Sequence, residues 1–340
     1  MAYDAFLLLS FGGPEGQDDV LPFLENVTRG RGIPRERLEA VAGHYRHFGG
    51  VSPINAQCRA LIEALRPQLD LPIYWGNRNW HPMLADTVRQ MRDDGVQRAL
   101  AFVTSPFGSY SSCRQYLDDI ERARAEVPGA PPIDKIRHYH DHPGYIAPHA
   151  DAVHTALGAL PSRMKARLVF TAHSIPTAMN AASGPGGAGS QGGPGRYEAQ
   201  LRETAALVAA EAAPELEWDL VWQSRSGPPQ VPWLEPDIND HLEALAAAGV
   251  TEVVVSPIGF ISDHLEVIWD LDEEARATAA RLGLAYVRAA TPGTDPRFVD
   301  MIRQLVGERV LAHSNVRHAL GTVPTWDSCP ADCCASPKRA

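Results

Sequence analysis

Short apolar runs alternate with longer segments of helical period along most of this chain of 340 residues. The short runs end in Gly, Pro or Ser, and the longer segments place apolar residues three or four positions apart. This alternation predicts an α/β fold in which helices cover parallel strands. Strands are predicted at 5–9, 72–75, 99–103, 167–170, 220–222 and 252–256, with helices at 55–69, 83–94, 114–127, 147–160, 197–212 and 241–248.

The alternation of strands and helices occurs twice, once in each half of the chain. Segment 129–143, which contains Pro-Pro and several His and Asp residues, interrupts it and is typical of a domain junction. We therefore predict an N-terminal α/β domain over 1–145, a C-terminal α/β domain over 146–310 and an extension over 311–340. Segment 184–195 is too rich in Gly for a regular element, so it is either a mobile loop beside the site or a tolerated insertion.

Composition excludes several classes of function. The chain carries 31 Lys and Arg against 41 Asp and Glu, a net charge of −10, which argues against general binding to nucleic acid. No apolar run is long enough for a bilayer span, and Asp4 lies where a signal peptide would be basic. These features predict a cytoplasmic protein without stable membrane insertion.

Candidate chemistry lies after the strands, because ligands of parallel sheets bind beyond the carboxyl ends of the strands. His173 follows the fourth predicted strand directly. A histidine at this position is either a satisfied structural residue or a group that accepts a proton or binds a transition metal. The spacing alone favours neither interpretation.

An acidic stripe is the most informative pattern in the second half. Glu266, Asp270 and Glu274 recur every four positions, so on a helix they share one face of an otherwise apolar segment. One interpretation is a row of oxygen ligands that guides a divalent cation to a pocket. The alternative is that Asp263 caps the helix, Glu266 completes its capping box and the remaining acids are solvated.

Six ordered motifs, spread over nearly the whole chain, resemble those of the ferrochelatases. They are Leu8-Leu-Ser-Phe-Gly-Gly-Pro14, His47-Phe-Gly-Gly-Val-Ser-Pro-Ile54, Trp80-His-Pro82, Thr171-Ala-His-Ser-Ile-Pro176, Trp222-Gln-Ser-Arg-Ser-Gly227 and Ser256-Pro-Ile-Gly-Phe-Ile-Ser-Asp-His-Leu-Glu-Val-Ile-Trp-Asp-Leu-Asp272. The resemblance implies two similar α/β domains, each with a four-stranded parallel sheet, and a porphyrin cleft between them. It also implies insertion of Fe²⁺ into a porphyrin with loss of two pyrrole protons.

The resemblance assigns roles to individual residues. His173 and Glu266 match the facing pair at the insertion centre and are named both as iron ligands and as proton acceptors. Asp270, Glu273 and Glu274 match the acidic ridge that forms a cation route or outer metal site.

Substrate contacts follow from the same resemblance. Arg29 and Arg31 match an Arg-rich turn that contacts the porphyrin carboxylates, although surface charge on a turn is the alternative interpretation. The other residues that match porphyrin-contacting positions are Phe11, Tyr45, Ser52 and Tyr116.

Three of the five cysteines, Cys329, Cys333 and Cys334, lie within the last dozen residues, which indicates metal chemistry. The resemblance to animal and actinobacterial ferrochelatases implies that these three residues and Cys113 bind a 2Fe-2S cluster, which requires four thiolates. The alternatives are a tail with free thiols and a Zn²⁺ site with the same ligands. Cys58, on an apolar helix face, is interpreted as core.

The high Ala, Arg and Gly content and the cysteine tail are most similar to actinobacterial members, which implies coproporphyrin III as substrate and Fe-coproporphyrin as product. Protoporphyrin IX is the alternative substrate. Two other hypotheses are a non-catalytic tetrapyrrole-binding or iron-sulfur sensing protein and a cobalt or nickel chelatase. Resemblance to bacterial relatives favours a monomer.

Overall fold

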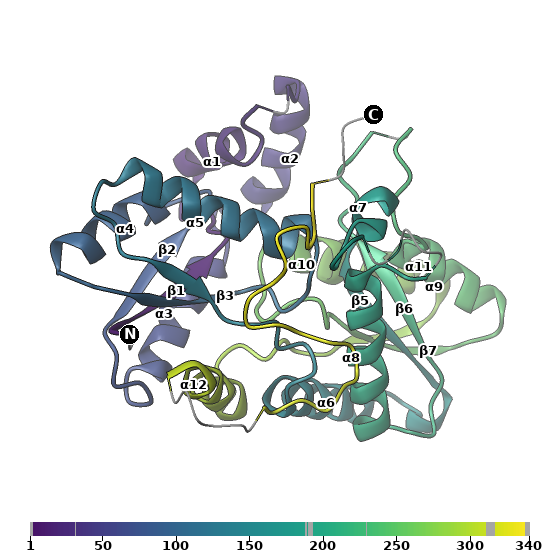
Figure 1. Ribbon diagram of the computed structural model, residues 1–340. Coiled ribbons are helices and arrows are strands. Elements are labelled where there is room, and N and C mark those ends of the chain that lie inside the picture. Colours follow the sequence, from purple (N-terminus) through teal and green to yellow (C-terminus); the bar gives the residue numbers. More distant parts are fainter. Residues whose placement is uncertain are drawn as a thin grey trace.

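The computed structural model describes residues 3–30, 32–187, 189, 193–228, 230–310 and 317–336, and it contains two parallel sheets (Figure 1). The first sheet has the order β2-β1-β3-β4. Its strands are β1 (Ala5–Ser10), β2 (Ile73–Asn77), β3 (Ala99–Val103) and β4 (Ile133–Lys135). The central strands β1 and β3 are almost completely buried, because helices cover both faces of a parallel sheet.

The second sheet repeats this topology with the order β6-β5-β7-β8. Its strands are β5 (Ala166–His173), β6 (Trp218–Gln223), β7 (Glu252–Ser256) and β8 (Ala285–Arg288). In each half the first strand therefore lies second in its sheet, between its two successors. The predicted α/β class is confirmed, as are the two four-stranded parallel sheets that the resemblance implied.

All six predicted strands are present, but two edge strands were missed. Segment 129–143, predicted only as an interruption, contains β4, whose sequence Ile-Asp-Lys has a single apolar residue. β8 is half-buried along its length and was missed although the sequence contains the apolar run Leu284-Ala-Tyr-Val287. Both are edge strands, as are the correctly predicted β2 and β6.

The helices cover the sheets and connect their strands. Their bounds are α1 Val20–Val27, α2 Arg35–His47, α3 Ile54–Leu65, α4 Leu84–Asp93, α5 Gln115–Glu126, α6 Pro143–Gly158, α7 Thr177–Ala181, α8 Arg196–Ala212, α9 Ile238–Ala247, α10 Leu265–Val267, α11 Arg276–Leu282 and α12 Pro296–Val310. Two π-helical segments join them, η2 (Tyr110–Arg114) before α5 and η5 (Ile268–Ala275) between α10 and α11. Among the described residues, no helix is both long and apolar enough to cross a bilayer.

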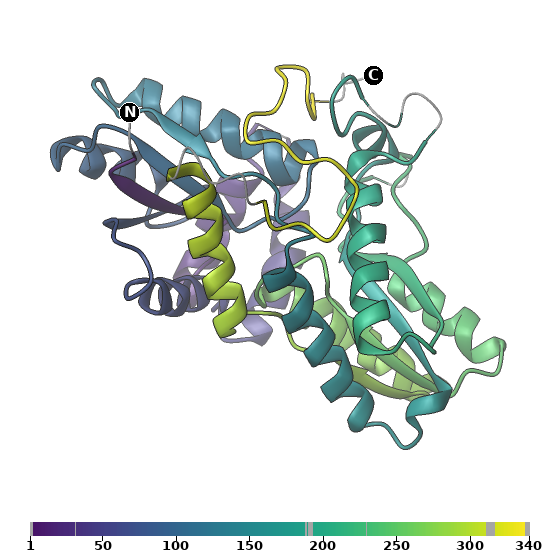
Figure 2. The same cartoon turned by 60° about the horizontal axis from the view of Figure 1, so that its bottom comes forward.

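The two halves share one apolar core. It contains Phe102 of β3, Phe170 of β5 and Phe298 of α12, all fully buried. The hydroxyl of Tyr145 in α6 also donates a hydrogen bond of 2.6 Å to the carbonyl of Ile258, which follows β7. α12 packs against both α6 and α3, as Figure 2 shows, and thereby returns the chain to the first half.

The described part of the C-terminal extension, residues 317–336, contacts both halves (Figure 1). Arg196 of α8 donates to the carbonyl of Pro324 at 2.7 Å, and its guanidinium lies over the Trp326 ring. Arg114 of η2 donates to the carbonyl of Ala331 at 2.9 Å. The extension is therefore attached to the fold by polar contacts before and within its cysteine segment.

Candidate active site

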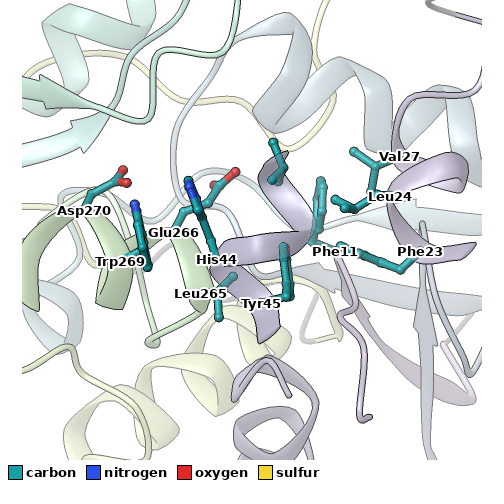
Figure 3. Close-up of a pocket in the computed structure, with 11 residues that line it drawn as sticks. Phe11, Phe23, Leu24, Val27, His44, Tyr45, Leu265, Glu266, Trp269 and Asp270 are labelled. Carbon is teal, nitrogen blue, oxygen red and sulfur yellow. The ribbon is translucent and has the colours of Figure 1, made fainter. Parts of the chain in front are cut away.

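A pocket lies between α1 and α2 of the first half and α10 and η5 of the second half (Figure 3). It contains about 450 Å³ of space, part of which is open to solvent. Aromatic and aliphatic side chains form most of its lining, with acids on one side. The lining residues are Phe11, Phe23, Leu24, Val27, Val41, His44, Tyr45, Leu265, Glu266, Trp269 and Asp270.

His173 and Glu266 meet beside this pocket. His173 is the last residue of β5 and Glu266 belongs to α10, and their Nε2 and Oε2 atoms lie 3.8 Å apart. Both side chains are partly open to solvent, with exposed fractions of 32% and 52%. The pair predicted from the sequence is thus brought together in the structure.

The backbone around His173 sets the orientation of its ring. The Nδ1 atom hydrogen-bonds the carbonyl of Ser174, which requires Nδ1 to carry the proton in the neutral imidazole. The lone pair of the neutral ring is therefore on Nε2, the atom that lies 3.8 Å from Glu266 Oε2. The hydroxyl of Tyr197 donates to the carbonyl of His173 at 2.9 Å and holds the strand end in place.

The acidic stripe continues from Glu266 along η5. A π-helix has more than four residues per turn, so residues four positions apart stay closer to one face than they would on an α-helix. Asp270 accepts hydrogen bonds from the Ser224 hydroxyl and from Gln223 Nε2, the latter at 3.3 Å. Burial, reinforced by the charges of Glu266 and Glu274, raises the pKa of Asp270 to about 7 even though both hydrogen bonds oppose the rise.

The capping-box alternative for this stripe is wrong. His264 occupies the N-cap position of α10 and makes no side-chain capping bond. Asp263 instead accepts two hydrogen bonds of 3.1 Å from Arg288 and one of 3.2 Å from Thr291. Glu266 is therefore free of a capping role.

The outer acids of the ridge face aromatic side chains. Glu274 accepts a hydrogen bond of 2.8 Å from Trp269 Nε1, and Glu273 lies 3.9 Å from His47 Nε2. The Trp269 ring also stacks on His44 of α2, with 3.9 Å between ring centroids and 8° between planes. This stack connects the two halves across the pocket and was not predicted, although both residues lie within or beside the recognised motifs.

The wall opposite the acids is aromatic. Phe23 makes edge contacts with Phe11 and Tyr45, with ring centroids 6.2 and 5.8 Å apart. Burial raises the pKa of the Tyr45 phenol above its ordinary value, so Tyr45 presents a neutral ring to the pocket. Such a wall suits a flat apolar ligand.

Among the described residues, three of the other predicted substrate contacts, Ser52, Tyr116 and Arg29, do not line this pocket. Ser52 is buried against Gly13, and Tyr116 is buried in the core of the first half. Arg29 is exposed and its guanidinium donates to Asn26. Arg31 lies outside the described residues.

A buried arginine behind the aromatic wall was not predicted. Arg78 follows β2, and its guanidinium lies 5.8 Å from the Phe11 ring centroid and 4.4 Å from that of Tyr116. It is paired with Asp119, and both side chains are almost fully buried. Its position directly after a strand of the first sheet is the sequence signal that could have identified it.

The four cysteines expected to act together are brought together by the fold. Cys113 lies in η2 and is buried, as are Cys333 and Cys334, whose sulfur atoms are 3.8 Å apart. Cys329 hydrogen-bonds with Cys113 and Cys333, and these interactions lower the pKa of Cys329. Cys58 is buried in the apolar core, as its place on an apolar helix face predicted.

The described part of the glycine-rich segment contacts the cysteine tail. Gly184 donates from its backbone N–H to Cys334 Sγ at 3.3 Å, and the Cys334 N–H donates to the Gly184 carbonyl at 3.2 Å. Gly186 donates to Asp332 Oδ2 at 3.1 Å. This segment therefore joins the second half to the tail.

Comparison with solved structures supports the architecture. The structure titled SirB from Bacillus subtilis with Fe³⁺ has a TM-score of 0.53 at 13% identity, over 93% of this chain and 99% of that one. The sirohydrochlorin chelatase SirB in complex with cobalt, from Bacillus subtilis subspecies spizizenii, has a TM-score of 0.54 at 11% identity over the same shares. At this identity the likeness shows a shared fold.

Comparison of sequences is more specific. A protein of Nocardia farcinica named coproporphyrin III ferrochelatase is 57% identical, over 100% of this chain and 98% of its own length. A protein of Streptomyces griseus with the same name is 53% identical, over 99% and 94%. The family model for Ferrochelatase matches residues 3–310, which include both sheets, His173 and the acidic ridge. As its motifs predicted, the chain belongs to the ferrochelatase family of enzymes.

Proposed function

We propose that this protein inserts ferrous iron into coproporphyrin III and releases Fe-coproporphyrin as a step of heme biosynthesis. The observation that carries the proposal is the facing pair of His173 and Glu266 beside a pocket with an aromatic wall, in a member of the ferrochelatase family. The choice of porphyrin is supported by relatives at 53–57% identity that are named for coproporphyrin III.

His173 and Glu266 perform the central chemistry in this proposal. The His173 Nε2 lone pair and the Glu266 carboxylate are suitable ligands for Fe²⁺ and are also two bases within reach of one centre. Insertion displaces two pyrrole protons, and each base can accept one. Because the two side chains are 32% and 52% exposed, the accepted protons have a direct path to water.

Asp270, Glu273 and Glu274 supply the cation route. They form one acidic face that ends at Glu266, and carboxylate oxygens bind divalent cations without holding them irreversibly. A cation that reaches Asp270 must displace the proton that burial retains there near neutral pH.

Phe11 and Tyr45 pack against the macrocycle, and Arg29 and Arg31 contact its propionates. The exposed guanidinium of Arg29 is free to change its partner from Asn26 to a carboxylate. Ser52 and Tyr116 are buried, so they contact substrate only after the wall in front of them rearranges on binding.

We further propose that Cys113, Cys329, Cys333 and Cys334 hold a 2Fe-2S cluster. The residues fit this group, because four thiols from η2 and the tail converge and three of them are buried. When bound, the cluster supplies a one-electron redox centre, which the insertion of Fe²⁺ does not require. A Zn²⁺ ion with the same ligands is the alternative.

The protein is proposed to act in the cytoplasm as a monomer without stable membrane insertion.

The deciding experiment is an anaerobic assay with Fe²⁺ in which coproporphyrin III and protoporphyrin IX are offered separately and the loss of free-porphyrin fluorescence is followed. We expect strong preference for coproporphyrin III. Preference for protoporphyrin IX would overturn the substrate assignment. Tight binding of both porphyrins without insertion would favour a carrier or sensor, and faster insertion of Co²⁺ or Ni²⁺ than of Fe²⁺ would favour a different chelatase.

A further inference from the structure

A second group of metal-ligating side chains lies outside the cleft. His140 and Asp141 belong to the segment that connects β4 to α6, and Glu203 lies on α8. Each residue offers one ligand atom, and these three atoms lie within 4.8 Å of one another. His140 and Asp141 are buried, with exposed fractions of 0% and 2%, so this is an interior site rather than a cluster of surface acids.

The surroundings of the Asp141 carboxyl indicate that a ligand is missing. Its Oδ1 atom is buried and has no hydrogen-bond partner, and the Arg137 guanidinium lies 3.9 Å away. Arg137 is already engaged by Glu308 through two hydrogen bonds of 2.8 and 2.9 Å. The charge of Asp141 is therefore poorly compensated, which is costly in the interior.

Glu203 adds a second carboxyl group at the same place. It accepts hydrogen bonds from His140 Nε2 at 3.1 Å and from the backbone N–H groups of Thr322 and Val323 at 2.5 and 3.0 Å. Asp141 and Glu203 therefore place two carboxyl groups beside the His140 imidazole, and Arg137 is engaged by Glu308.

We propose that His140, Asp141 and Glu203 bind a divalent transition-metal ion of the Zn²⁺ or Fe²⁺ class. One imidazole and two carboxylates are a common ligand set for such ions, and two positive charges balance the two carboxylates. His140 Nε2 and Glu203 Oε2 lie 3.1 Å apart, close to the separation of about 3.3 Å between two ligands of a tetrahedral ion with bonds of 2.0–2.1 Å.

The site has a structural role in the proposal, because it lies under the C-terminal extension. The N–H of Leu320 donates to the Asp141 carbonyl at 2.9 Å, and the N–H of Val323 donates to Glu203 Oε1 at 3.0 Å. A bound ion would fix both residues and thereby hold the extension against α8 and the junction between the halves. The inference rests on neither the insertion chemistry nor the 2Fe-2S cluster.

The test measures zinc in the dialysed full-length protein after loading with Zn²⁺. We expect Asp141→Asn and His140→Gln each to bind one equivalent less than the wild type, whereas the control His154→Ala, at an exposed position of α6, keeps that equivalent. Equal zinc in the wild type and both variants would overturn the proposal and leave a proton shared between His140 and Glu203. Asn has nearly the same shape as Asp, so Asp141→Asn is expected to fold. If it does not fold, His140→Gln tests the same proposal.

X-ray absorption at the zinc edge identifies the donor atoms in protein loaded with a single equivalent. We expect nitrogen and oxygen neighbours, and sulfur neighbours at about 2.3 Å would place the metal at the cysteines and overturn the assignment. Zinc should also slow hydrogen exchange at residues 320–323 in the wild type but not in Asp141→Asn. Equal slowing in both proteins would contradict the structural role.

Discussion

The Nε2 atom of His173 and the Oε2 atom of Glu266 face each other at 3.8 Å, across the carboxyl end of the second sheet. This separation is too long for a hydrogen bond. Each atom therefore keeps its lone pairs available to a third partner. A metal ion and the pyrrole nitrogens of a porphyrin are partners of that kind.

Removing either member of this pair should abolish insertion while porphyrin binding survives. We expect His173→Ala and Glu266→Gln each to lower the insertion rate at least about a hundredfold, because each removes a base and a metal ligand at the reacting centre. Insertion is measured by loss of porphyrin fluorescence, and binding by the shift of the Soret band. Glu243→Gln, at an exposed carboxylate of α9 that pairs with Arg281, is the matched control and should remain active. A variant that binds porphyrin and still inserts iron at the wild-type rate would exclude the residue from catalysis.

Asp270 should make stability depend on pH in the absence of divalent metal. Its carboxyl titrates near 3.8 in the unfolded chain and at about 7 in the folded protein, because burial disfavours the charge. Between these values the unfolded state ionises first, so the free energy of unfolding falls as pH rises from about 4 to 7. Asp270→Asn should remove this pH-dependent loss of stability. At pH 8 its free energy of unfolding should exceed that of the wild type by roughly 2–4 kcal/mol.

Urea unfolding of both proteins at pH 4 and at pH 8 checks this expectation. The difference between Asp270→Asn and the wild type should be small at pH 4, where the folded wild type is protonated and the unfolded chain is still partly protonated. Asp240→Asn removes an exposed carboxyl on α9 and should show no such dependence. A constant difference between Asp270→Asn and the wild type across this range would mean that the Asp270 carboxyl titrates normally.

Arg29 should contribute to porphyrin affinity more than to turnover. Arg29→Ala removes an exposed guanidinium at the turn after α1, and we expect the half-saturating concentration of coproporphyrin III to rise about three- to tenfold. The maximal insertion rate should change less than twofold, because Arg29 lies outside the lining of the pocket. Arg66→Ala, an exposed arginine that follows α3 and pairs with Glu63, is the control. An unchanged half-saturating concentration in Arg29→Ala would remove this residue from propionate binding.

Cys113 should be required for visible colour. Because Cys113 is the one proposed ligand outside the tail, Cys113→Ser should lower the iron and sulfide content of anaerobically purified protein and bleach its absorption. Cys58→Ser changes a buried thiol in α3 and should keep its colour. Full colour with full iron and sulfide in Cys113→Ser would mean that another residue completes the ligand set.

The sequence predicted the buried parts of the fold well, because burial on both faces produces continuous apolar runs. The predicted bounds of β3 and β7 agree with the structure at every residue. β4 was missed because Ile-Asp-Lys has a single apolar residue, whereas β8 was missed although Leu284-Ala-Tyr-Val287 is an apolar run. α12 was also missed, and its packing against α6 and α3 depends on a tertiary contact between the halves that local pattern does not reveal.

Sequence motifs identified individual residues of the candidate site but not how they are arranged. Motifs at the ends of strands identified His173 and Glu266, but their facing arrangement depends on how α10 lies beside the end of β5. His140 and Glu203 come from distant segments that carry no motif, so their contact required the structure. Ser52 and Tyr116 show the reverse case, since both match the family pattern yet are buried and do not line the pocket.

The stack between His44 and Trp269 should control the entry of porphyrin. Both rings line the pocket, one from each half, so a planar macrocycle entering between the halves must compete with a contact at 3.9 Å. Such a contact contributes about 0.5–1.5 kcal/mol, so His44→Ala should speed association about two- to tenfold. Stopped-flow quenching of tryptophan fluorescence measures the rate, and His154→Ala, at an exposed position of α6, is the control. Burial lowers the pKa of His44, so the stack involves a neutral ring and the acceleration should not depend on pH between 7 and 8. An association rate that is unchanged in His44→Ala would show that the macrocycle enters without separating these rings.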